Sequence, residues 1–293
     1  MINKENIKMN ENLELHTTYK VGGICKYFIT PDSIDELIKL IKYLRENNIK
    51  YMILGNGSNT IFSSKTYDGA IINLNNINKM NIDGNKIYVE AGYQLIKLSM
   101  DALNNGLSGL EFAAGIPGNL GGAIYMNAGA YKSDMSNLIK DVTFLDENLE
   151  IKTLTKDELE FSYRKSIFQH KNYIVLSANL ELTYGDKEEI KELMNNRKER
   201  RLASQPLEYP SAGSVFRNPS EDIFAGKLIE ELGLKGYSIG GAKISEKHAN
   251  FIINDGGATG EDIKALIDLV KVKVKEKYNI DLHVEQRFIN FGE

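Results

Sequence analysis

The chain has 293 residues, of which 42% are hydrophobic and 26% charged, and its formal net charge is −4 at pH 7. This composition is ordinary for a globular protein with one large domain or roughly two to three small ones, and the mild acidity argues against a nucleic acid or an acidic membrane as partner. A single cysteine, Cys25, excludes an internal disulfide and fits a reducing cytoplasm.

The first part of the chain predicts a small α/β unit. The N-terminus has no apolar core of a signal peptide, so we expect no export. A strand over 21–29 is followed by Ser33 and Glu36, which form a capping box, and apolar residues at helical spacing predict a helix over 34–46. A strand over 49–54 then leads into a glycine turn, which completes a strand–helix–strand unit.

That glycine turn has the composition of a pyrophosphate-binding nest. Its glycines free the backbone φ angle, and its polar side chains add hydrogen-bond donors to the amides. The turn departs from the dinucleotide fingerprint, because Thr60 stands where the fingerprint has its third glycine. In addition, no helix is predicted to begin after the turn, and no acidic residue marks a strand end about twenty residues on. We therefore predict phosphate binding by turn amides and hydroxyls of Gly55, Asn56, Gly57, Ser58, Asn59 and Thr60.

The remaining elements are mixed helices and strands without an internal repeat. Short strands are expected over 70–74 and 86–90, with a hairpin turn at 83–85 between neighbouring β segments. Downstream strands are expected over 142–145, 150–154, 173–182, 251–254 and 281–290. Helices are expected over 95–104, 186–203 and about 225–232, and a further one is capped by Thr259 and Asp262. Residues 205–210 hold two of the five prolines and are taken as a connection into a second domain.

At the centre, residues 112–131 form an uncharged run of twenty residues, long enough by count to cross a bilayer. Five glycines, Pro117 and two asparagines exclude a continuous apolar helix, so we predict no membrane span. Such a run can present bare backbone N–H groups to a flat or anionic ligand. Tight turns within a core are the alternative from composition alone.

Two further features bear on ligands. Arg197, Lys198, Arg200 and Arg201 form a basic cluster on the helix 186–203, and its pattern favours a solvated face over a steering field for an anionic ligand. The four histidines lack metal-ligand spacing, so we predict no metal site.

Six motifs in order resemble the UDP-N-acetylenolpyruvoylglucosamine reductase (UDP-N-acetylmuramate dehydrogenase) family of peptidoglycan synthesis. They are the run TYKVGG at 18–23, the turn 55–59, the glycine segment 115–118 with 127–129, SYRKS at 162–166, the segment 211–219, and Glu285. Each alone is weak, but six in the family's order and spacing are specific. The resemblance is to the shorter class, since the chain has no room for the insert that supplies a closing tyrosine in the longer class.

The resemblance implies an α+β fold with an FAD-binding domain of the vanillyl-alcohol-oxidase / p-cresol methylhydroxylase type over 1–190, in two subdomains at about 1–75 and 76–190. It also implies a C-terminal α+β substrate domain over 191–293. The implied cofactor is non-covalent FAD, with NADPH as hydride donor and UDP-N-acetylglucosamine enolpyruvate as substrate. We expect a cytoplasmic monomer with neither nucleic-acid nor membrane partners.

The implied reaction delivers a hydride from flavin N5 to the vinyl carbon of an enolpyruvyl ether and a proton to the neighbouring carbon. By resemblance, Ser214 donates the proton, while Arg164 and Glu285 stabilise the enolate, with Glu285 either protonated through burial or orienting another donor. Arg217, Asn218 and Lys227 are expected to reach the diphosphate or the sugar. In addition to the turn 55–60, FAD is expected to contact Gly115, Ile116, Pro117, Gly118, Gly121, Gly122, Ala123 and Asn127.

Plainer interpretations remain for these residues: a surface arginine, a turn serine and an ion pair of Glu285 with Arg287. Two other functions also remain open. One is a flavin-dependent sugar or alcohol oxidase of the same fold, although Cys25 and His16, as possible covalent attachment points, lie outside both glycine-rich stretches. The other is a non-catalytic nucleotide-binding module.

Overall fold

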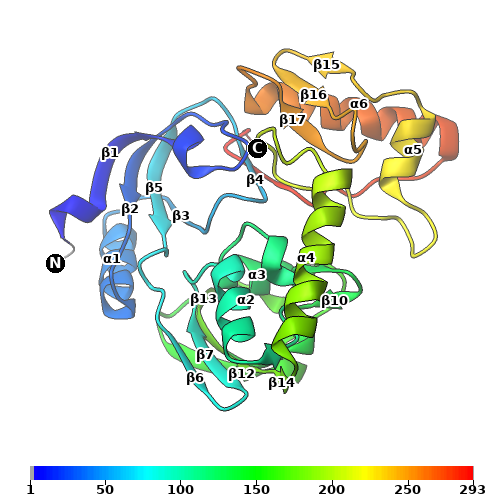
Figure 1. The fold of residues 1–293 in the computed structure, drawn as a ribbon. Helices are drawn as coiled ribbons and strands as arrows, with labels where there is room; N and C mark the ends of the chain where they lie inside the picture. Colours follow the sequence, from blue (N-terminus) through cyan, green and yellow to red (C-terminus); the bar gives the residue numbers. More distant parts are fainter. Residues whose placement is uncertain (1–2, 293) are drawn as a thin grey trace. The chain divides into compact units, whose positions relative to one another are not determined.

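The computed structural model describes residues 3–292 (Figure 1). Its helices are α1 (Ile34–Glu46), α2 (Leu95–Asn104), α3 (Leu120–Met126), α4 (Lys187–Ser204), α5 (Ala225–Glu231) and α6 (Gly260–Tyr278). Its strands are β1 (Ile7–Asn12), β2 (Ile24–Ile29), β3 (Tyr51–Leu54), β4 (Thr60–Phe62), β5 (Tyr67–Asn73), β6 (Met80–Asp83), β7 (Lys86–Glu90), β8 (Leu107–Ser108), β9 (Gly129–Ala130), β10 (Ser133–Asp134), β11 (Ile139–Leu145), β12 (Ile151–Thr155), β13 (Ile174–Glu181), β14 (Thr183–Tyr184), β15 (Ser238–Ile239), β16 (Ala242–Ile244), β17 (Ile252–Asn254) and β18 (Arg287–Ile289).

The chain divides into two compact units that alternate along the sequence. Unit 1 consists of the described residues of Met1–Met9 together with Tyr27–Asn56 and Gly69–Glu199. Unit 2 consists of Asn10–Lys26, Gly57–Asp68 and the described residues of Arg200–Glu293. The expected FAD-binding domain over 1–190 and substrate domain over 191–293 are defined by the ligand that each would bind. The boundary between them therefore stays a prediction.

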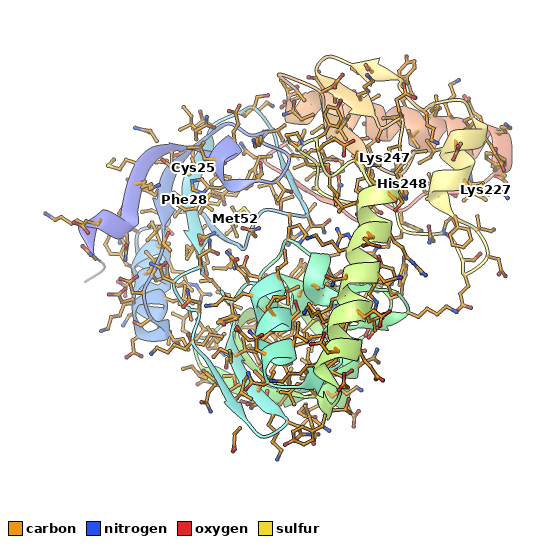
Figure 2. The ribbon with its side chains drawn as sticks, in the orientation of Figure 1. Cys25, Phe28, Met52, Lys227, Lys247 and His248 are labelled. Carbon is orange, nitrogen blue, oxygen red and sulfur yellow. The ribbon has the colours of Figure 1, made fainter. Side chains whose placement is uncertain are left out.

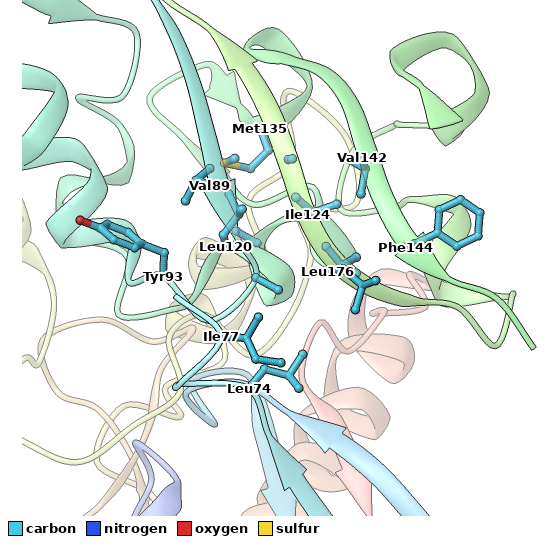
Figure 3. Close-up of a cluster of buried hydrophobic side chains, with 14 of the residues drawn as sticks. Leu74, Ile77, Val89, Tyr93, Leu120, Ile124, Met135, Val142, Phe144 and Leu176 are labelled. Carbon is cyan, nitrogen blue, oxygen red and sulfur yellow. The ribbon is translucent and has the colours of Figure 1, made fainter. Parts of the chain in front are cut away.

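Unit 1 is built around the five-stranded antiparallel sheet β12-β11-β13-β7-β6. The expected turn at 83–85 is confirmed, because Asp83 pairs with Lys86 across the β6–β7 hairpin. Figure 3 shows side chains of β7, β11 and β13 in one buried cluster with Leu120 and Ile124 of α3. This cluster anchors the glycine-rich stretch to the sheet.

Both capped helices form, but the expected capping box is complete only at α6, because at α1 Glu36 Oε2 accepts from the Asp32 amide at 3.0 Å instead of from Ser33. Ser33 Oγ accepts a hydrogen bond from the Glu36 amide at 3.2 Å at the start of α1, and Thr259 with Asp262 forms the capping box that begins α6. Each cap satisfies amides that the first helical turn leaves unpaired. The predicted apolar stripe is fully buried in α6, whereas in α1 Ile34 and Ile38 of the stripe are only half-buried.

The glycine-rich stretch contains one short helix, α3, which was not predicted. Gly121 and Gly122 disfavour a helix, but the burial of Leu120, Ala123 and Ile124 against the unit 1 core outweighs that propensity. The helix ends at Asn127, whose φ of 41° lies in the left-handed region. No helix among residues 3–292 combines the length and apolarity needed to cross a membrane.

In unit 2, α6 packs beside the sheet β15-β16-β17 (Figure 1). Strand β18 pairs in parallel with β4. The prediction of one strand over 281–290 is wrong in its length, since only Arg287–Ile289 is strand. The reason is a change of partner: the Glu285 amide donates to Val215 O at 2.8 Å, whereas the Arg287 amide donates to Asn59 O at 3.0 Å. A segment that leaves one partner for another cannot form a single continuous ladder.

Candidate active site

Unit 1 brings the end of β3 next to the glycine-rich stretch. Asn56 Nδ2 donates to Pro117 O at 2.6 Å, and a Cβ on Gly55 would lie 3.5 Å from Asn119 Oδ1. Asn73 Nδ2 donates a hydrogen bond to the carbonyl of Gly55 at 2.9 Å. Two stretches that the sequence predicted to share a ligand therefore meet at their glycines and asparagines.

Asn119, within the glycine-rich stretch, was not among the site residues expected from the sequence. Its side chain is buried, and its Nδ2 donates to Gly92 O at 2.6 Å and to Asn75 Oδ1 at 3.0 Å. Because a carbonyl only accepts, the bond to Gly92 fixes which end of the amide is nitrogen. The Oδ1 atom is enclosed and has no hydrogen-bond partner among the described residues, which is uncommon for a buried acceptor.

Several amides of the glycine-rich stretch are already used by the protein. The Leu120 amide donates to Tyr93 O and the Gly121 amide to Ala91 O, both at 2.9 Å, and the Gly118 amide donates to Ile116 O at 2.8 Å. The expectation of bare amides along the whole stretch is therefore too broad. The first two bonds instead fix the backbone of the stretch onto Ala91 and Tyr93, which follow β7.

Gly122 differs from its neighbours. A Cβ built on it would meet no atom within 4 Å, whereas a Cβ on Gly121 would lie 3.0 Å from Ala91 Cβ. The outer side of α3 thus offers backbone without side chains, the kind of surface on which a flat nucleotide can lie. The open face at Gly122 and the unpaired oxygen of Asn119 both fit a bound FAD.

The other predicted FAD residues of unit 1 shape the stretch. Gly115 closes a short 3-10 helix, Ile116 and Pro117 lead out of it, and Ala123 is buried in the core. Asn127 is 1% exposed; its Nδ2 donates to Ser162 O at 3.1 Å and its Oδ1 accepts from the Ser136 amide at 3.0 Å. Both ends of the Asn127 side chain therefore hold protein segments in place.

Arg164 lies in unit 1 at the tip of a tight turn. Ser162 and Lys165 exchange backbone hydrogen bonds at 3.2 and 3.0 Å, and Arg164 itself has a φ of 58°, in the left-handed region. Its Nη2 donates to Gly129 O at 2.7 Å, and its Cζ lies 5.2 Å from the ring centroid of Tyr163. A hydrogen bond and an aromatic face thus help to fix the guanidinium.

Unit 2 brings the segment that carries Ser214 next to the segment that carries Glu285. The Glu285 amide donates to Val215 O at 2.8 Å, and the carbonyl of Glu285 accepts from Asn59 Nδ2 at 3.1 Å. Gly213 has a φ of 73°, a conformation that glycine adopts without strain and that turns the chain just before Ser214.

The backbone around Ser214 and Glu285 is held by a buried side chain. Gln286 Nε2 donates to Ala212 O at 3.0 Å, and Gln286 Oε1 accepts from Tyr19 Oη at 3.1 Å. Tyr19 is fully buried, and burial raises the pKa of its phenol far above the usual range, so it stays a hydrogen-bond donor. These contacts keep the two candidate catalytic segments in register.

The turn residues Gly57–Thr60 also belong to unit 2. Gly57 has a φ of 62°, and a Cβ there would lie 2.1 Å from His16 O, so only glycine fits. Ser58 follows it half-buried, and Thr60 begins β4. Because the side-chain Nδ2 of Asn59 donates to Glu285 O, the Asn59 side chain joins the turn to the candidate catalytic segment.

The predicted substrate residues are placed differently from one another. The Arg217 amide donates to His283 O at 3.0 Å, beside Glu285, and Arg217 Nε is buried without a partner among the described residues. Asn218 Oδ1 accepts from the Ala225 amide at the start of α5. Lys227 lies on α5 (Figure 2), with its side chain 74% exposed and its Nζ 3.9 Å from Glu231 Oε1.

A second unpaired atom lies against the turn in unit 2. Thr18 Oγ1 is buried without a partner among the described residues, and the Thr18 amide donates to Gly57 O at 3.3 Å. Thr18 has no separate signal in the sequence beyond its place in the run 18–23. The three buried unpaired side-chain atoms of the described chain, on Thr18, Asn119 and Arg217, thus all adjoin segments expected to bind ligands.

His248 has a structural position in unit 2. Its Nδ1 accepts from the Asn250 amide at 3.2 Å, its ring lies 4.8 Å from that of Phe251, and burial lowers its pKa. Asn250 in turn exchanges hydrogen bonds with the backbone of Phe216, two residues after Ser214. Within the described residues, no group of three or more histidine, cysteine or acidic side chains is arranged to hold a metal ion.

Two family models match successive parts of the chain. One family model, described as UDP-N-acetylenolpyruvoylglucosamine reductase, C-terminal domain, matches residues 205–289. A second, described as FAD binding domain, matches residues 25–155. The reductase match contains Ser214 and Glu285. The FAD-binding match contains both glycine-rich stretches.

Relatives and solved structures extend over almost the whole chain. UDP-N-acetylenolpyruvoylglucosamine reductase of Clostridium perfringens (strain SM101 / Type A) is 46% identical over 287 residues, which cover 98% of this chain and 94% of the relative. That of Caldanaerobacter subterraneus subsp. tengcongensis is 49% identical over 281 residues, covering 96% and 93%. The crystal structure of the reductase from Thermus caldophilus, 33% identical, has a TM-score of 0.81 and covers 96% of this chain and 97% of its own.

A more distant likeness shows the fold alone. A grass pollen allergen with glucose dehydrogenase activity has a TM-score of 0.51 at 15% identity over 64% of this chain and 43% of its own. Together with the FAD-binding match, this places the fold in the vanillyl-alcohol-oxidase type. With both family models matched in order and relatives nearly half identical from end to end, the chain belongs to the UDP-N-acetylenolpyruvoylglucosamine reductase family of FAD-dependent oxidoreductases.

Proposed function

We propose that this protein reduces the enolpyruvyl group of UDP-N-acetylglucosamine enolpyruvate to give UDP-N-acetylmuramate, using FAD and taking its hydride from NADPH. The reaction belongs to peptidoglycan precursor synthesis, and we assign it to a cytoplasmic monomer. The observation that carries the proposal is the pairing of the Ser214 segment with Glu285 inside the part matched by the reductase C-terminal domain.

Bound FAD supplies the hydride, and the protein must hold the substrate and supply one proton. Ser214 is the proposed proton donor, because the turn at Gly213 and the bonds from Gln286 fix its backbone beside Glu285. Glu285 is held at both its amide and its carbonyl, so its carboxyl group is well placed to orient a neighbouring donor or stabilise the enolate.

Arg164 is the proposed ligand for the carboxylate and the spreading negative charge of the enolate. A guanidinium stays charged at all relevant pH values and presents a planar fork to a carboxylate. Its bond to Gly129 O and its contact with Tyr163 fix that plane before substrate arrives, which is the preorganisation that electrostatic stabilisation needs.

The ligand-holding residues follow from the contacts above. For FAD we propose the turn Gly55–Thr60 together with Gly115, Ile116, Pro117, Gly118, Gly121, Gly122, Ala123 and Asn127, supported by the open face at Gly122 and the meeting of Asn56 with Pro117. For the substrate we propose Arg217, whose buried Nε has no partner among the described residues, with Asn218 and the more exposed Lys227. The FAD-binding domain over 1–190 and the substrate domain over 191–293 remain part of this proposal.

The direct test is NADPH consumption by the purified yellow protein on addition of UDP-N-acetylglucosamine enolpyruvate, with UDP-N-acetylmuramate identified by mass spectrometry. NADH and substrate-free reactions serve as controls. Oxygen-dependent oxidation of a sugar without NADPH, flavin left in an acid-precipitated pellet, or a colourless protein would each contradict the proposal.

A further inference from the structure

Backbone strain gathers at one place in unit 1. Four non-glycine residues with positive φ belong to segments that are hydrogen-bonded to one another: Asn127 (41°), Tyr131 (56°), Lys132 (61°) and Arg164 (58°). The left-handed conformation costs an L-residue about 1–2 kcal/mol. Such residues persist only where the surrounding structure holds them, and they concentrate at functional sites.

Two of these residues form the tip of a two-residue hairpin. Strands β9 and β10 pair Ala130 with Ser133 and Gly129 with Asp134, so Tyr131 and Lys132 alone make the loop. Two positive φ angles in a two-residue loop give the type I′ geometry, for which Asn-Gly is the usual sequence. A Cβ on Gly129 would lie 2.4 Å from Ser133 O, so the base of this hairpin is tightly closed. We call residues 129–134 the Tyr131 hairpin.

The tip of the Tyr131 hairpin is fastened to α4. Tyr131 Oη donates to the carbonyl of Arg197 at 3.0 Å, and the Arg197 guanidinium carbon lies 4.9 Å from the centroid of the Tyr131 ring. One residue of the helix therefore makes both a hydrogen bond and a cation–π contact with the same side chain. These two contacts offset the strain of a loop that lacks glycine.

The base of the same hairpin holds Arg164. The carbonyl of Gly129, the first residue of the hairpin, accepts from Arg164 Nη2 at 2.7 Å. Asn127, two residues before it, donates to Ser162 O in the turn that carries Arg164. A shift of the hairpin would therefore move both the hydrogen-bond acceptor of the guanidinium and the turn beneath it.

We propose that Tyr131 and Arg197 are positioning residues, which lock the Tyr131 hairpin onto α4 so that the Gly129 carbonyl fixes the guanidinium of Arg164 where it meets the substrate carboxylate. The proposal rests on the proposed function, because it gives Arg164 its task. A misplacement of about 1 Å in such a group can cost on the order of a hundredfold in rate. The proposal also gives Arg197 a structural role, which differs from both interpretations of the basic cluster above, a solvated face and a steering field for an anionic ligand.

The first test replaces Arg197 by methionine, which approximates the aliphatic part of the side chain and removes the guanidinium with its charge. We expect kcat for the enolpyruvyl substrate to fall about tenfold, equivalent to about 1.4 kcal/mol of barrier. The rate at which NADPH bleaches the flavin should stay unchanged, because Arg164 acts on the other substrate. Lys198→Met, at the exposed next position of α4, is the matched control and should leave both rates unchanged.

Tyr131→Phe is the second variant, since it keeps the ring under Arg197 and removes only the hydroxyl that bonds to the Arg197 carbonyl. We expect a smaller fall in kcat, about threefold, from the loss of one neutral hydrogen bond. Thermal midpoints and flavin absorbance of each variant establish that it is folded and loaded.

A double-mutant cycle with Arg164→Lys decides whether the effect runs through Arg164. If it does, Arg197→Met should lower kcat less than about twofold in the Arg164→Lys background, against about tenfold alone. An equal fall in both backgrounds would overturn the inference while leaving the proposed function intact. Absence of turnover by the unmodified protein would instead contradict the proposed function and this inference with it.

Discussion

At the scale of single residues, removal of the Ser214 hydroxyl gives the sharpest test of the chemistry. We expect Ser214→Ala to let NADPH reduce the flavin at an unchanged rate, while turnover of the enolpyruvyl substrate falls about a hundredfold or more, the usual contribution of a positioned acid. Stopped-flow absorbance separates the two half-reactions. Ser220→Ala, an exposed serine six residues on, is the control; unchanged turnover in Ser214→Ala would refute the assignment of the proton donor.

Cys25 gives the fold a pH dependence at the same scale. The thiol is fully buried, and burial raises its pKa to about 11 from an ordinary value near 9. Between these values the folded state keeps a proton that the unfolded state has released, so stability falls as pH rises from about 9 to 11, by about 2 kcal/mol. Urea unfolding of the unmodified protein and of Cys25→Ala across this range checks it; an equally steep decline in both would show that other groups cause it.

At the scale of elements, α3 allows stability and cofactor binding to be separated. Gly122→Ala adds a Cβ that meets no atom within 4 Å, so we expect the protein freed of FAD to gain about 0.5–1 kcal/mol from helix propensity. If FAD lies on that face, its dissociation constant should rise at least tenfold, measured by flavin fluorescence. In Gly121→Ala the new Cβ would lie 3.0 Å from Ala91 Cβ, so a loss of stability is expected there instead. Unchanged FAD affinity in Gly122→Ala would place the cofactor elsewhere.

Elements with strong local signals were predictable. Capping residues predicted α1 and α6, and the Asp83–Asn85 turn predicted the β6–β7 hairpin. These signals act between residues that are close in sequence. The helix α3 was missed because burial of Leu120 and Ile124 outweighs two glycines, and burial is not visible in local sequence. The extent of β18 was misjudged because a segment that changes partners still alternates in polarity.

Predictability of the candidate site divides in the same way. The approach of Gly55 and Asn56 to the stretch around Pro117 was expected from the matching motifs. The unpaired oxygen of Asn119 and the link from Arg197 through Tyr131 to Arg164 were not, since each depends on atoms brought together by the tertiary fold. The bond from Asn59 Nδ2 to Glu285 O was not expected either, because only the fold brings these two residues together.

At the scale of the whole molecule, unit 2 cannot be obtained by cutting the chain once. Its hydrophobic core contains Tyr19, Val21 and Ile61 together with residues after Ala212. Loss of these three buried side chains would remove about 6 kcal/mol of burial, which is comparable with the total stability of an ordinary domain. We therefore expect a fragment of residues 200–293 to lack cooperative thermal unfolding by circular dichroism. A sharp transition in that fragment would contradict the discontinuous core.

The parallel pairing of β4 with β18 has a consequence for synthesis on the ribosome. Thr60 emerges from the exit tunnel roughly 200 residues before its partner Arg287. Until the residues from Ala212 onward follow, Ile61 and Tyr19 lack the C-terminal side chains against which they pack, so the nascent polypeptide carries exposed apolar surface during that interval. A ribosome that stalls before Arg287 would therefore leave this part of the molecule open to chaperones and proteases.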